Sequence, residues 1–351
     1  MTPLARLLVE RIREGGPIPV ADYMAECLLH PLHGYYTTRQ PFGAAGDFTT
    51  APEISQMFGE LVGLALAQAW LDRGAPDPFT LAELGPGRGT LMADILRATR
   101  GVPGFHAAAR PVLVEVSPRL REVQARTLAP QIPLWLDRVE DLPDRPLFLV
   151  ANEFLDALPI RQFQLTPEGW RERLVGLAEG ALAFGLSPPL PQVPDSPAFR
   201  AARPGDLVEH CAPARAAAAA ALGPVLRHGG AALFIDYGGW RSNGDTLQAL
   251  RAHAFDPVLA HPGQADLTAH VDFEPLAALA PAHAYTTQGE FLRRLGIGVR
   301  AERLARNLTG AALENHRAAH RRLTDPAEMG SLFKVLALTR ADSPVLPGFG
   351  P

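Results

Sequence analysis

The chain has 351 residues, with 33 lysines and arginines against 37 acidic residues, and a formal net charge of −4. This balance creates no global positive field, so nucleic acid is not the expected partner. Hydrophobic residues make up 47% and charged residues 20% of the chain, which is ordinary for a protein with a large core. Two cysteines are too few for a disulfide framework, and no apolar run approaches the roughly 20 residues that a membrane helix needs.

The amino-terminal segment is amphipathic but shows no targeting peptide. Glu10 and Glu14 are acidic residues of the kind that a transit peptide avoids, and an apolar signal core is missing. We therefore expect a bacterial-type cytoplasm as the compartment.

The first 75 residues predict a helical region. Apolar residues on one face indicate a helix over residues 3–14, and a second helix over residues 20–29 lies between two prolines. Residues 31–52 are rich in Gly, Pro and Thr, which indicates a loop. The pattern of residues 54–72 is again helical and is stopped by Gly74.

Beyond residue 75 the chain alternates between short apolar runs and helical patterns. This alternation predicts a parallel sheet covered by helices on both faces, the doubly wound α/β class. The expected strands are residues 79–84, 111–116, 132–136, 146–151, 231–236, 282–287 and 332–339, and the expected helices are residues 90–100, a segment opened by Ser117 and Pro118, and residues 212–227.

Two stretches interrupt the alternation, and we expect both to be insertions over the mouth of the sheet. The first resembles a hairpin (162–165 and 171–175) followed by a proline-rich loop, and the second is irregular and rich in His and Asp. The expected organisation is a helical region (1–75), the cofactor-binding half of the core (76–160), an inserted hairpin and loop (161–205), the core continued (206–240), a second insertion (241–280) and the carboxyl-terminal part of the core (281–351).

The turn after the first expected strand carries glycines at positions 85, 87 and 89. Glycine is needed where φ is positive or a ligand approaches the backbone, and a nucleotide-like ligand binds at this point of a doubly wound sheet. A dinucleotide fingerprint would have its third glycine at Thr90 and would not require Glu83 two places before the first glycine. A nicotinamide-dependent oxidoreductase is therefore disfavoured, and a cofactor-fluorescence titration would distinguish it.

The same segment resembles motif I of class I S-adenosylmethionine-dependent methyltransferases, which reads acid-x-Gly-x-Gly-x-Gly. That cofactor carries a sulfonium and an ammonium group, and a nearby carboxylate attracts both. We expect S-adenosyl-L-methionine as the cofactor, while a plain glycine turn before a helix is the alternative. The residues assigned to it here are Glu83, Gly85, Pro86, Gly87 and Gly89.

A second acid ends the next expected strand. Glu115 could accept hydrogen bonds from both ribose hydroxyls, a role that methyltransferases and dehydrogenases share. The alternative is a solvated glutamate at a strand end. After the third strand, residues 137–143 resemble the acidic loop that edges the adenine.

Acids also follow the fourth expected strand, in the segment that holds Asn152, Glu153 and Asp156. Paired carboxylates there could grip a guanidinium, localise charge away from the attacking nitrogen and take up the released proton. The alternative is that Glu153 and Asp156 only favour a helix N-terminus through its dipole.

Other polar groups leave their roles open. His270 and Asp272 would share one side of a strand, where they could bind substrate or act as a base, or they could satisfy loop backbone groups. No third ligand is spaced for a metal, so we expect none. The arginines of residues 293–322 could form a nucleic-acid surface, but interleaved glutamates favour a solvated helix face. Cys27 and Cys211 are expected to be inert thiols.

Several motifs together resemble the MidA-type methyltransferase family, and they cover most of the chain. They are residues 46–56 with 58–60, 83–90, 114–118, 152–159, 235–238, 244–247, 266–273 and 329–335.

The resemblance implies a class I methyltransferase fold with an amino-terminal helical region and insertions. Mitochondrial members of the family are assembly factors of respiratory complex I and place symmetric dimethylation on an arginine of a core subunit. The partner it implies is thus a protein substrate such as a complex I core subunit. Carried over by position, it implies a cofactor cradle of Glu83, Gly85, Gly87, Gly89 and Glu115, a covering segment with Thr50 and Glu53, and Asn152, Glu153 and Asp156 facing the transferred methyl group.

We therefore predict an S-adenosylmethionine-dependent methyltransferase that modifies an arginine of a partner protein. A methyltransferase for a small molecule or RNA, and a non-catalytic assembly factor that retains the fold, remain as alternatives. The oligomeric state, with a homodimer as one option, is left open.

Overall fold

The computed structural model describes residues 1–38, 49–241 and 244–350. Their contacts divide the chain into two compact units. Unit 1 holds Met1–Phe48, Asp156–Ala216 and Gly239–Pro275, and unit 2 holds Thr49–Leu155, Ala217–Gly238 and Leu276–Pro351. The helical region expected over residues 1–75 is therefore shared between the two units.

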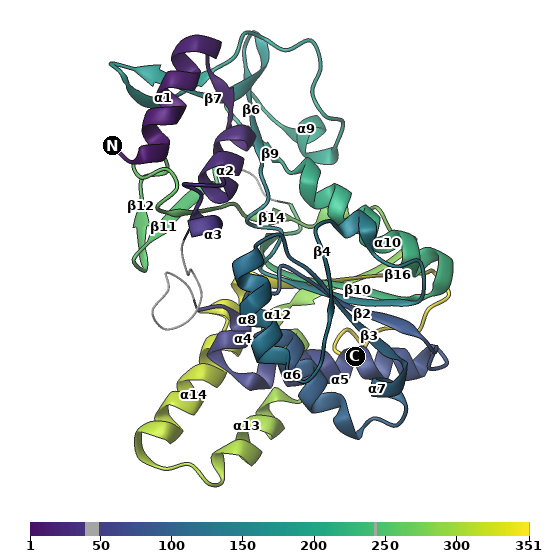
Figure 1. Ribbon diagram of the computed structural model, residues 1–351. Coiled ribbons are helices and arrows are strands. Elements are labelled where there is room, and N and C mark those ends of the chain that lie inside the picture. The colour runs from purple at the N-terminus through teal and green to yellow at the C-terminus, as the bar shows by residue number, and fades with distance from the viewer. Residues whose placement is uncertain (39–48, 242–243, 351) are drawn as a thin grey trace. The chain divides into compact units, whose positions relative to one another are not determined.

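Unit 2 is built on a sheet that runs through seven strands in the order β15-β16-β10-β5-β2-β3-β4. Figure 1 labels β16, β10, β2, β3 and β4 of this sheet. Numbered along the chain, the strands lie in the order 6-7-5-4-1-2-3. Their bounds are β2 (Phe79–Leu84), β3 (Ala109–Val114), β4 (Leu134–Leu136), β5 (Leu147–Asn152), β10 (Gly230–Gly239), β15 (Ala282–Thr287) and β16 (Phe333–Thr339). All seven expected strands are present, which confirms the α/β fold class.

The sheet is mixed, whereas the sequence predicted a parallel one. Strands β4, β3, β2, β5 and β10 are parallel to one another, but β16 is antiparallel to both β10 and β15. The prediction is wrong for β16, which alone of these seven strands runs in the opposite direction, because a continuous apolar run indicates burial on both faces and not strand direction.

Helices cover the sheet of unit 2, and their ends follow local capping. Helix α5 (Gln56–Asp72) begins later than residue 54 because the Ser55 hydroxyl accepts a hydrogen bond from the Met57 N–H at 3.2 Å. The other helices are α4 (Ala51–Ile54), α6 (Thr90–Ala98), α7 (Phe105–Ala108), α8 (Pro118–Leu128), α10 (Ala212–His228, in unit 2 from residue 217), α12 (Gln288–Arg294), α13 (Ile297–Ala305), α14 (Gly310–Thr324) and α15 (Met329–Leu332), with 3-10 turns at Thr99–Gly101 and Val139–Asp141.

An aromatic cluster supports the strands that matter most for the site. The Phe79 ring centroid lies 5.1 Å from that of Phe105, 5.4 Å from that of Phe148 and 5.6 Å from that of Trp70. Every residue of β2 and β5 is buried. This packing fixes the two strands whose carboxyl ends carry Glu83 and Glu153.

Unit 1 combines helices with two small sheets. Its helices are α1 (Pro3–Gly15), α2 (Val20–Leu29), α3 (Tyr35–Thr38), α9 (Pro197–Ala201) and α11 (Glu274–Ala277, which ends in unit 2), and its first sheet contains β1 (Ile18–Pro19), β6 (Arg161–Thr166), β7 (Gly169–Ala178), β8 (Ala181–Leu186) and β9 (Leu207–His210). The expected hairpin is thus confirmed. Helices α3 and α4 show that residues 31–52 are not wholly a loop, and the Gly46–Phe48 part of the family motif lies outside the described residues.

The second insertion is more regular than predicted. Strands β11 (Gln248–Arg251), β12 (Ala254–Asp256) and β13 (Asp266–Thr268) form a three-stranded sheet, followed by β14 (Val271–Asp272). Such short strands contain too few residues for a clear period-2 pattern, which is why the sequence indicated irregular structure.

Burial raises the pKa of the Cys27 thiol in unit 1 to about 12, as expected of an inert cysteine.

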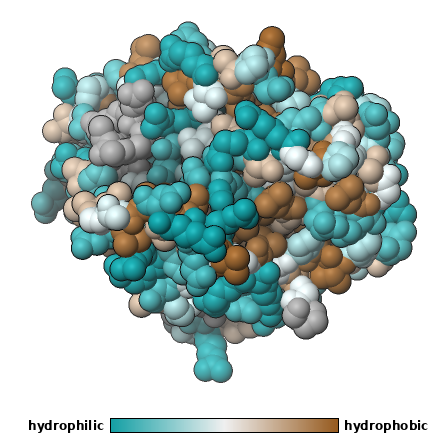
Figure 2. All heavy atoms as spheres, turned by 90° about the horizontal axis from the view of Figure 1, so that it is seen from below, coloured by the Kyte–Doolittle hydropathy of each residue, from teal (hydrophilic) through white to brown (hydrophobic). Residues whose placement is uncertain are grey.

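Helices α13 and α14 form a hairpin that extends away from the sheet of unit 2 (Figure 1). Seen from that side, the surface is largely hydrophilic, with apolar side chains in smaller areas (Figure 2). Several arginines of residues 293–322 are engaged in ion pairs: Arg293 and Arg294 with Glu290, Arg300 with Glu60, and Arg321 with Glu328. None of the described helices is long and apolar enough to cross a membrane.

A buried glutamate joins this hairpin to the core. Glu60 of α5 is 4% exposed and accepts hydrogen bonds from Arg97 of α6 at 2.5 Å and from Arg300 of α13 at 2.7 Å. Burial raises the pKa of Glu60, but the hydrogen bonds and charges of Arg300 and Arg97 outweigh it, so the pKa lies below its ordinary value.

We expect Glu60→Gln to lower the free energy of unfolding by about 1–3 kcal/mol at neutral pH, since both guanidinium groups also reach solvent. Because the folded pKa is depressed, this contribution is present above the unfolded pKa of about 4.3 and is lost as the pH falls through the folded pKa. Urea unfolding of both proteins at neutral and acidic pH measures it. Equal stability at neutral pH would contradict the prediction.

Candidate active site

The site is built where the strand order of unit 2 changes direction. From β2 the chain proceeds to β3 and β4 on one side and later to β5 and β10 on the other, so the loops after β2 and β5 diverge. In open α/β sheets ligands bind at this switch point, outside the carboxyl ends of the strands. The register pairs Leu84 with Ala151, which places Gly85 and Asn152 at the same edge of the sheet.

The turn after β2 has the backbone that its glycines predict. Gly85, Gly87 and Gly89 have φ values of +59°, +52° and +81°. The turn is closed by a 2.7 Å hydrogen bond from the Gly89 N–H to the Pro86 carbonyl, and Gly89 is the N-cap of α6. A Cβ at Gly85 would lie 2.7 Å from Phe154 Cδ2. A side chain at Gly85 would therefore collide with Phe154, so this position needs glycine for its packing as well as for its φ.

Glu83 is a buried acid with unused bonding capacity. It is 3% exposed, and the Met92 N–H near the start of α6 donates a hydrogen bond to its carboxylate. Its Oε2 atom has no hydrogen-bond partner among the residues that the structure describes. Burial raises the pKa of Glu83 well above its ordinary value, with the Met92 hydrogen bond opposing it. A cationic ligand group near Glu83 would compensate the carboxylate charge, and an ammonium N–H could also donate to Oε2, which fits the cationic groups of S-adenosylmethionine.

Glu115 is held in place rather than left solvated. Its Oε1 accepts a hydrogen bond from the Ser117 N–H at 2.8 Å, and its Oε2 accepts one from Gln124 Nε2 at 3.3 Å. Burial raises the pKa of Glu115, and these hydrogen bonds and Arg121 oppose the rise. Gln124 was missed by the sequence analysis, and a polar residue at an otherwise buried position of α8 is the only signal for it.

The segment with Thr50 and Glu53 is tied directly to the glycine turn. Glu53 lies on α4, and its Oε1 accepts a hydrogen bond from Thr90 Oγ1 at 2.7 Å. Its Oε2 lies 3.6 Å from Arg88 Nη1. The structure therefore brings this segment to the expected cradle, and it gives Thr90, first noted only as a missing glycine, a positive role.

The end of β5 carries a strained acid. Glu153 has φ +52°, which is unusual for a residue other than glycine, and its N–H donates to the Ile235 carbonyl at 2.9 Å. Its Oε1 accepts hydrogen bonds from the Ala51 N–H at 2.9 Å and from Asn152 Nδ2 at 3.0 Å. Within the described chain the Oδ1 atom of Asn152, a buried residue, has no hydrogen-bond partner. Strain of this kind clusters at functional sites, which favours a functional role for Glu153.

The remaining predicted site residues belong to unit 1. The Ala269 N–H donates to the backbone carbonyl of Asp156 at 3.0 Å, and the neighbouring His270 N–H donates to Thr246 Oγ1 at 2.9 Å. Asp156 is buried, and Asp272 lies on β14. The structure thus brings Asp156 next to the His270 segment, and the catalytic roles of Asp156, His270 and Asp272 stay predictions.

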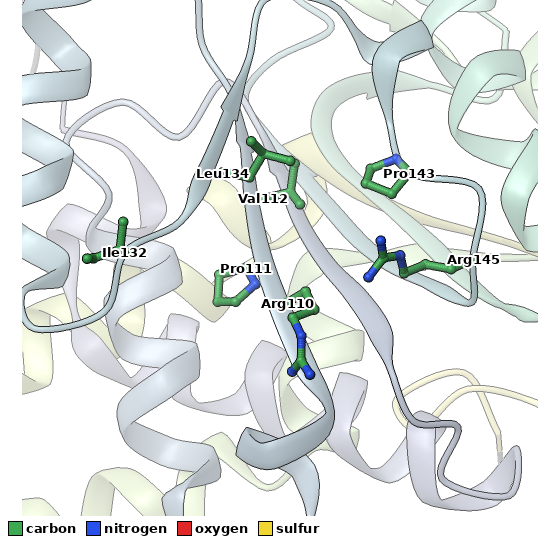
Figure 3. A pocket seen from close by; sticks show the side chains of 7 residues that line it. All are labelled: Arg110, Pro111, Val112, Ile132, Leu134, Pro143 and Arg145. Atoms are coloured by element: carbon green, nitrogen blue, oxygen red, sulfur yellow. The ribbon is translucent and has the colours of Figure 1, made fainter.

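One hollow of about 260 Å³ lies elsewhere in unit 2. It is lined by residues at the amino-terminal ends of the strands, including Arg110 at the start of β3, Leu134 at the start of β4 and Arg145 just before β5 (Figure 3). The glycine turn follows the carboxyl end of β2, so this hollow is not the ligand site described above. Among the described residues no group of three or more His, Cys, Asp or Glu side chains could hold a metal ion.

The chain is similar to several known proteins. A family model described as "Putative S-adenosyl-L-methionine-dependent methyltransferase" matches residues 61–291. The Drosophila melanogaster homolog of the mitochondrial protein arginine methyltransferase NDUFAF7 is 37% identical over 95% of this chain and 84% of its own length. The Homo sapiens protein arginine methyltransferase NDUFAF7 is 36% identical over 96% of this chain and 83% of its own. A Burkholderia thailandensis protein crystallised with S-adenosyl-homocysteine superposes with a TM-score of 0.82 at 29% identity, covering 99% of this chain and 94% of that one.

Proposed function

Because the chain belongs to the family of putative S-adenosyl-L-methionine-dependent methyltransferases, we propose that it methylates an arginine nitrogen of a partner protein. The observation that carries this proposal is the 36–37% identity, over about 95% of the chain, to proteins named protein arginine methyltransferases. A core subunit of respiratory complex I is the first acceptor to test, in a bacterial-type cytoplasm.

The residues of unit 2 fit the cofactor and divide its parts between them. S-adenosylmethionine supplies an electrophilic methyl group when it is bound. Glu83, with its free Oε2, would face the cationic portion, the backbone of Gly85 and Gly87 would allow close approach, and Glu115 would accept the ribose hydroxyls. Thr50 and Glu53, on the segment bonded to the turn, would cover it.

The acceptor needs a group that orients it and removes a proton. As a guanidinium nitrogen gains the methyl group, the carbon–sulfur bond breaks and one N–H proton must leave. Glu153 ends β5 beside the glycine turn and is the carboxylate of unit 2 that we assign to this role, with Asn152 next to it. A protonated guanidinium is a poor nucleophile, so a carboxylate that localises its charge lowers the barrier.

The experiment first identifies the proteins that copurify with the chain. Mass spectrometry then compares methylarginine in these same proteins from cells with and without the gene. The proposal is supported if methylarginine is lost when the gene is deleted and is restored when the parent gene, but not the gene for Glu153→Gln, is returned. Unchanged methylarginine together with gene-dependent methylation of RNA or of a small molecule would overturn it.

Glu83 provides an independent test of the cofactor side of the proposal. We expect Glu83→Gln to weaken S-adenosylmethionine binding about 10- to 100-fold, because a charge that would face the cationic portion of the cofactor is lost. Calorimetry measures this loss.

Because burial raises the folded pKa of Glu83, the stability linked to its protonated form is present below the unfolded pKa of about 4.3 and is lost as the pH rises through the folded pKa.

The ligand-free Glu83→Gln protein should therefore exceed the parent in thermal stability, and by more at alkaline than at acidic pH. If Glu83→Gln binds S-adenosylmethionine as tightly as the parent, Glu83 does not take part in binding the cofactor. If the difference in thermal stability between Glu83→Gln and the parent does not grow with pH, ionisation of the buried Glu83 carboxyl does not destabilise the parent.

A further inference from the structure

The buried side chain of Gln124 joins three separate parts of the cofactor cradle. Its Nε2 donates to the Gly87 carbonyl at 2.8 Å and to Glu115 Oε2 at 3.3 Å, and its Oε1 accepts from Trp135 Nε1 at 2.8 Å. Gln124 is 0% exposed, so water does not compete for these bonds. One side chain of α8 thus connects the loop after β2, the acid after β3 and strand β4.

The chemistry of the partners fixes the orientation of this amide. An indole N–H only donates, so the amide oxygen must face Trp135. A backbone carbonyl and an ionised carboxylate only accept, so the NH₂ group must face Gly87 and Glu115. An amide matches all three partners at once, whereas a carboxylate, an amine or an apolar group of the same length would leave at least one of them unsatisfied.

A second residue on the same face of α8 extends the connection. Arg121, three residues before Gln124, donates from Nε to the Glu115 carbonyl at 2.8 Å and from Nη2 to Asp137 Oδ1 at 2.6 Å. Ser117, the N-cap of α8, donates its N–H to Glu115. Helix α8 therefore holds the loops after β2, β3 and β4 in one arrangement.

We propose that Gln124 is a positioning residue that couples the glycine turn to the ribose-binding acid Glu115, and so sets the affinity for S-adenosylmethionine without touching it. The inference rests on the proposed function. In this proposal Gln124 fixes the distance between the turn that would bind the methionine part and the carboxylate that would bind the ribose. Trp135 fixes the orientation of the Gln124 amide.

The test compares Gln124→Met with Gln288→Met by calorimetry with S-adenosylhomocysteine. Gln288 is an equally buried glutamine of unit 2, and its Nε2 donates to the Leu323 carbonyl at 3.0 Å. Gln288→Met therefore also removes a buried amide that donates a hydrogen bond, but this hydrogen bond does not join parts of the proposed cradle. We expect Gln124→Met to weaken binding at least about tenfold, and Gln288→Met to lose stability while binding like the parent. Trp135→Phe should weaken binding in the same direction by a smaller factor.

A pH profile separates positioning from general loosening. Gln124→Glu places a second carboxylate beside Glu115, which raises the pKa values of the pair and removes the donor when both are ionised. When Glu at position 124 is protonated, its O–H can again donate. The affinity of Gln124→Glu relative to the parent should therefore recover as the pH falls from about 8 to about 6, whereas that of Gln124→Met should not.

The inference fails if Gln124→Met, folded by circular dichroism, binds S-adenosylhomocysteine as Gln288→Met does, or if Gln124→Glu shows no recovery at lower pH. Failure of the proposed substrate gives a different result. In that case the parent binds S-adenosylhomocysteine and the Gln124 variants bind it as predicted above, but no arginine is methylated in cells. That result overturns the proposed substrate and still supports the role of Gln124.

Discussion

Gly87→Val is expected to abolish cofactor binding, with an affinity for S-adenosylmethionine at least about 100-fold below that of the parent. Gly87 has φ +52°, a left-handed backbone that costs a residue with a Cβ about 1–2 kcal/mol, and more for a branched one. A valine would also fill the space beside the backbone through which a ligand must approach. Relief of the strain would move the Gly87 carbonyl, which Gln124 now holds at 2.8 Å.

Gly74→Val is the matched control for this variant. Gly74 follows α5 in the same unit, has φ +81°, and an added Cβ there would meet no atom within 4 Å. It carries the same kind of backbone strain without any link to the turn, so it should lower the melting temperature and keep parent-like binding. Calorimetric titration of both variants decides the matter, and tight binding by Gly87→Val would contradict a ligand role for the turn.

The core of the fold could be predicted because its signals are local. Largely apolar strands such as β2 and β5 and capped helix starts such as Ser117 are visible in a single stretch of sequence. Strand direction is not local. The position of β16 between β10 and β15 is set by how the chain returns to the sheet after four helices, and no residue of Phe333–Thr339 encodes it.

The site was predictable to the extent that its residues follow strand ends. Glu83, Glu115 and Glu153 each stand at or just beyond the carboxyl end of a parallel strand, and topology alone brings such positions to one edge. The residues that organise them were not predictable. Gln124 and Thr90 act through hydrogen bonds to partners 37 positions away in the sequence, and an isolated glutamine or threonine carries no motif.

Glu153 has a surprising geometry for a residue chosen from its acidity alone. The sequence favoured it for its charge after the fourth expected strand, whereas the structure also shows a left-handed backbone and two donors on Oε1. One of the donors is the Ala51 N–H of α4, the segment that also reaches the glycine turn through Glu53. Glu153 therefore links the expected covering segment to the end of β5.

We expect Glu153→Gln to slow methyl transfer about 100- to 10,000-fold, the usual effect of removing a group that accepts a proton in the transition state. The affinity for S-adenosylhomocysteine should change less than about threefold, because the amide oxygen can keep both hydrogen bonds that Oε1 accepts now. Transfer of a labelled methyl group into proteins of cells that lack the gene measures the rate, and calorimetry measures the affinity.

Glu60→Gln is the control that separates chemistry from stability. It also exchanges a buried carboxylate of unit 2 for an amide, but its partners are Arg97 and Arg300 rather than the turn, so it should unfold more easily and still transfer methyl groups at the parent rate below its melting temperature. If Glu153→Gln instead keeps the parent rate, Glu153 is not the group that accepts the proton. Asp156, three residues farther along the chain, would then be the next carboxylate to replace, because a positioned carboxylate is a suitable general base for the proton that the guanidinium loses.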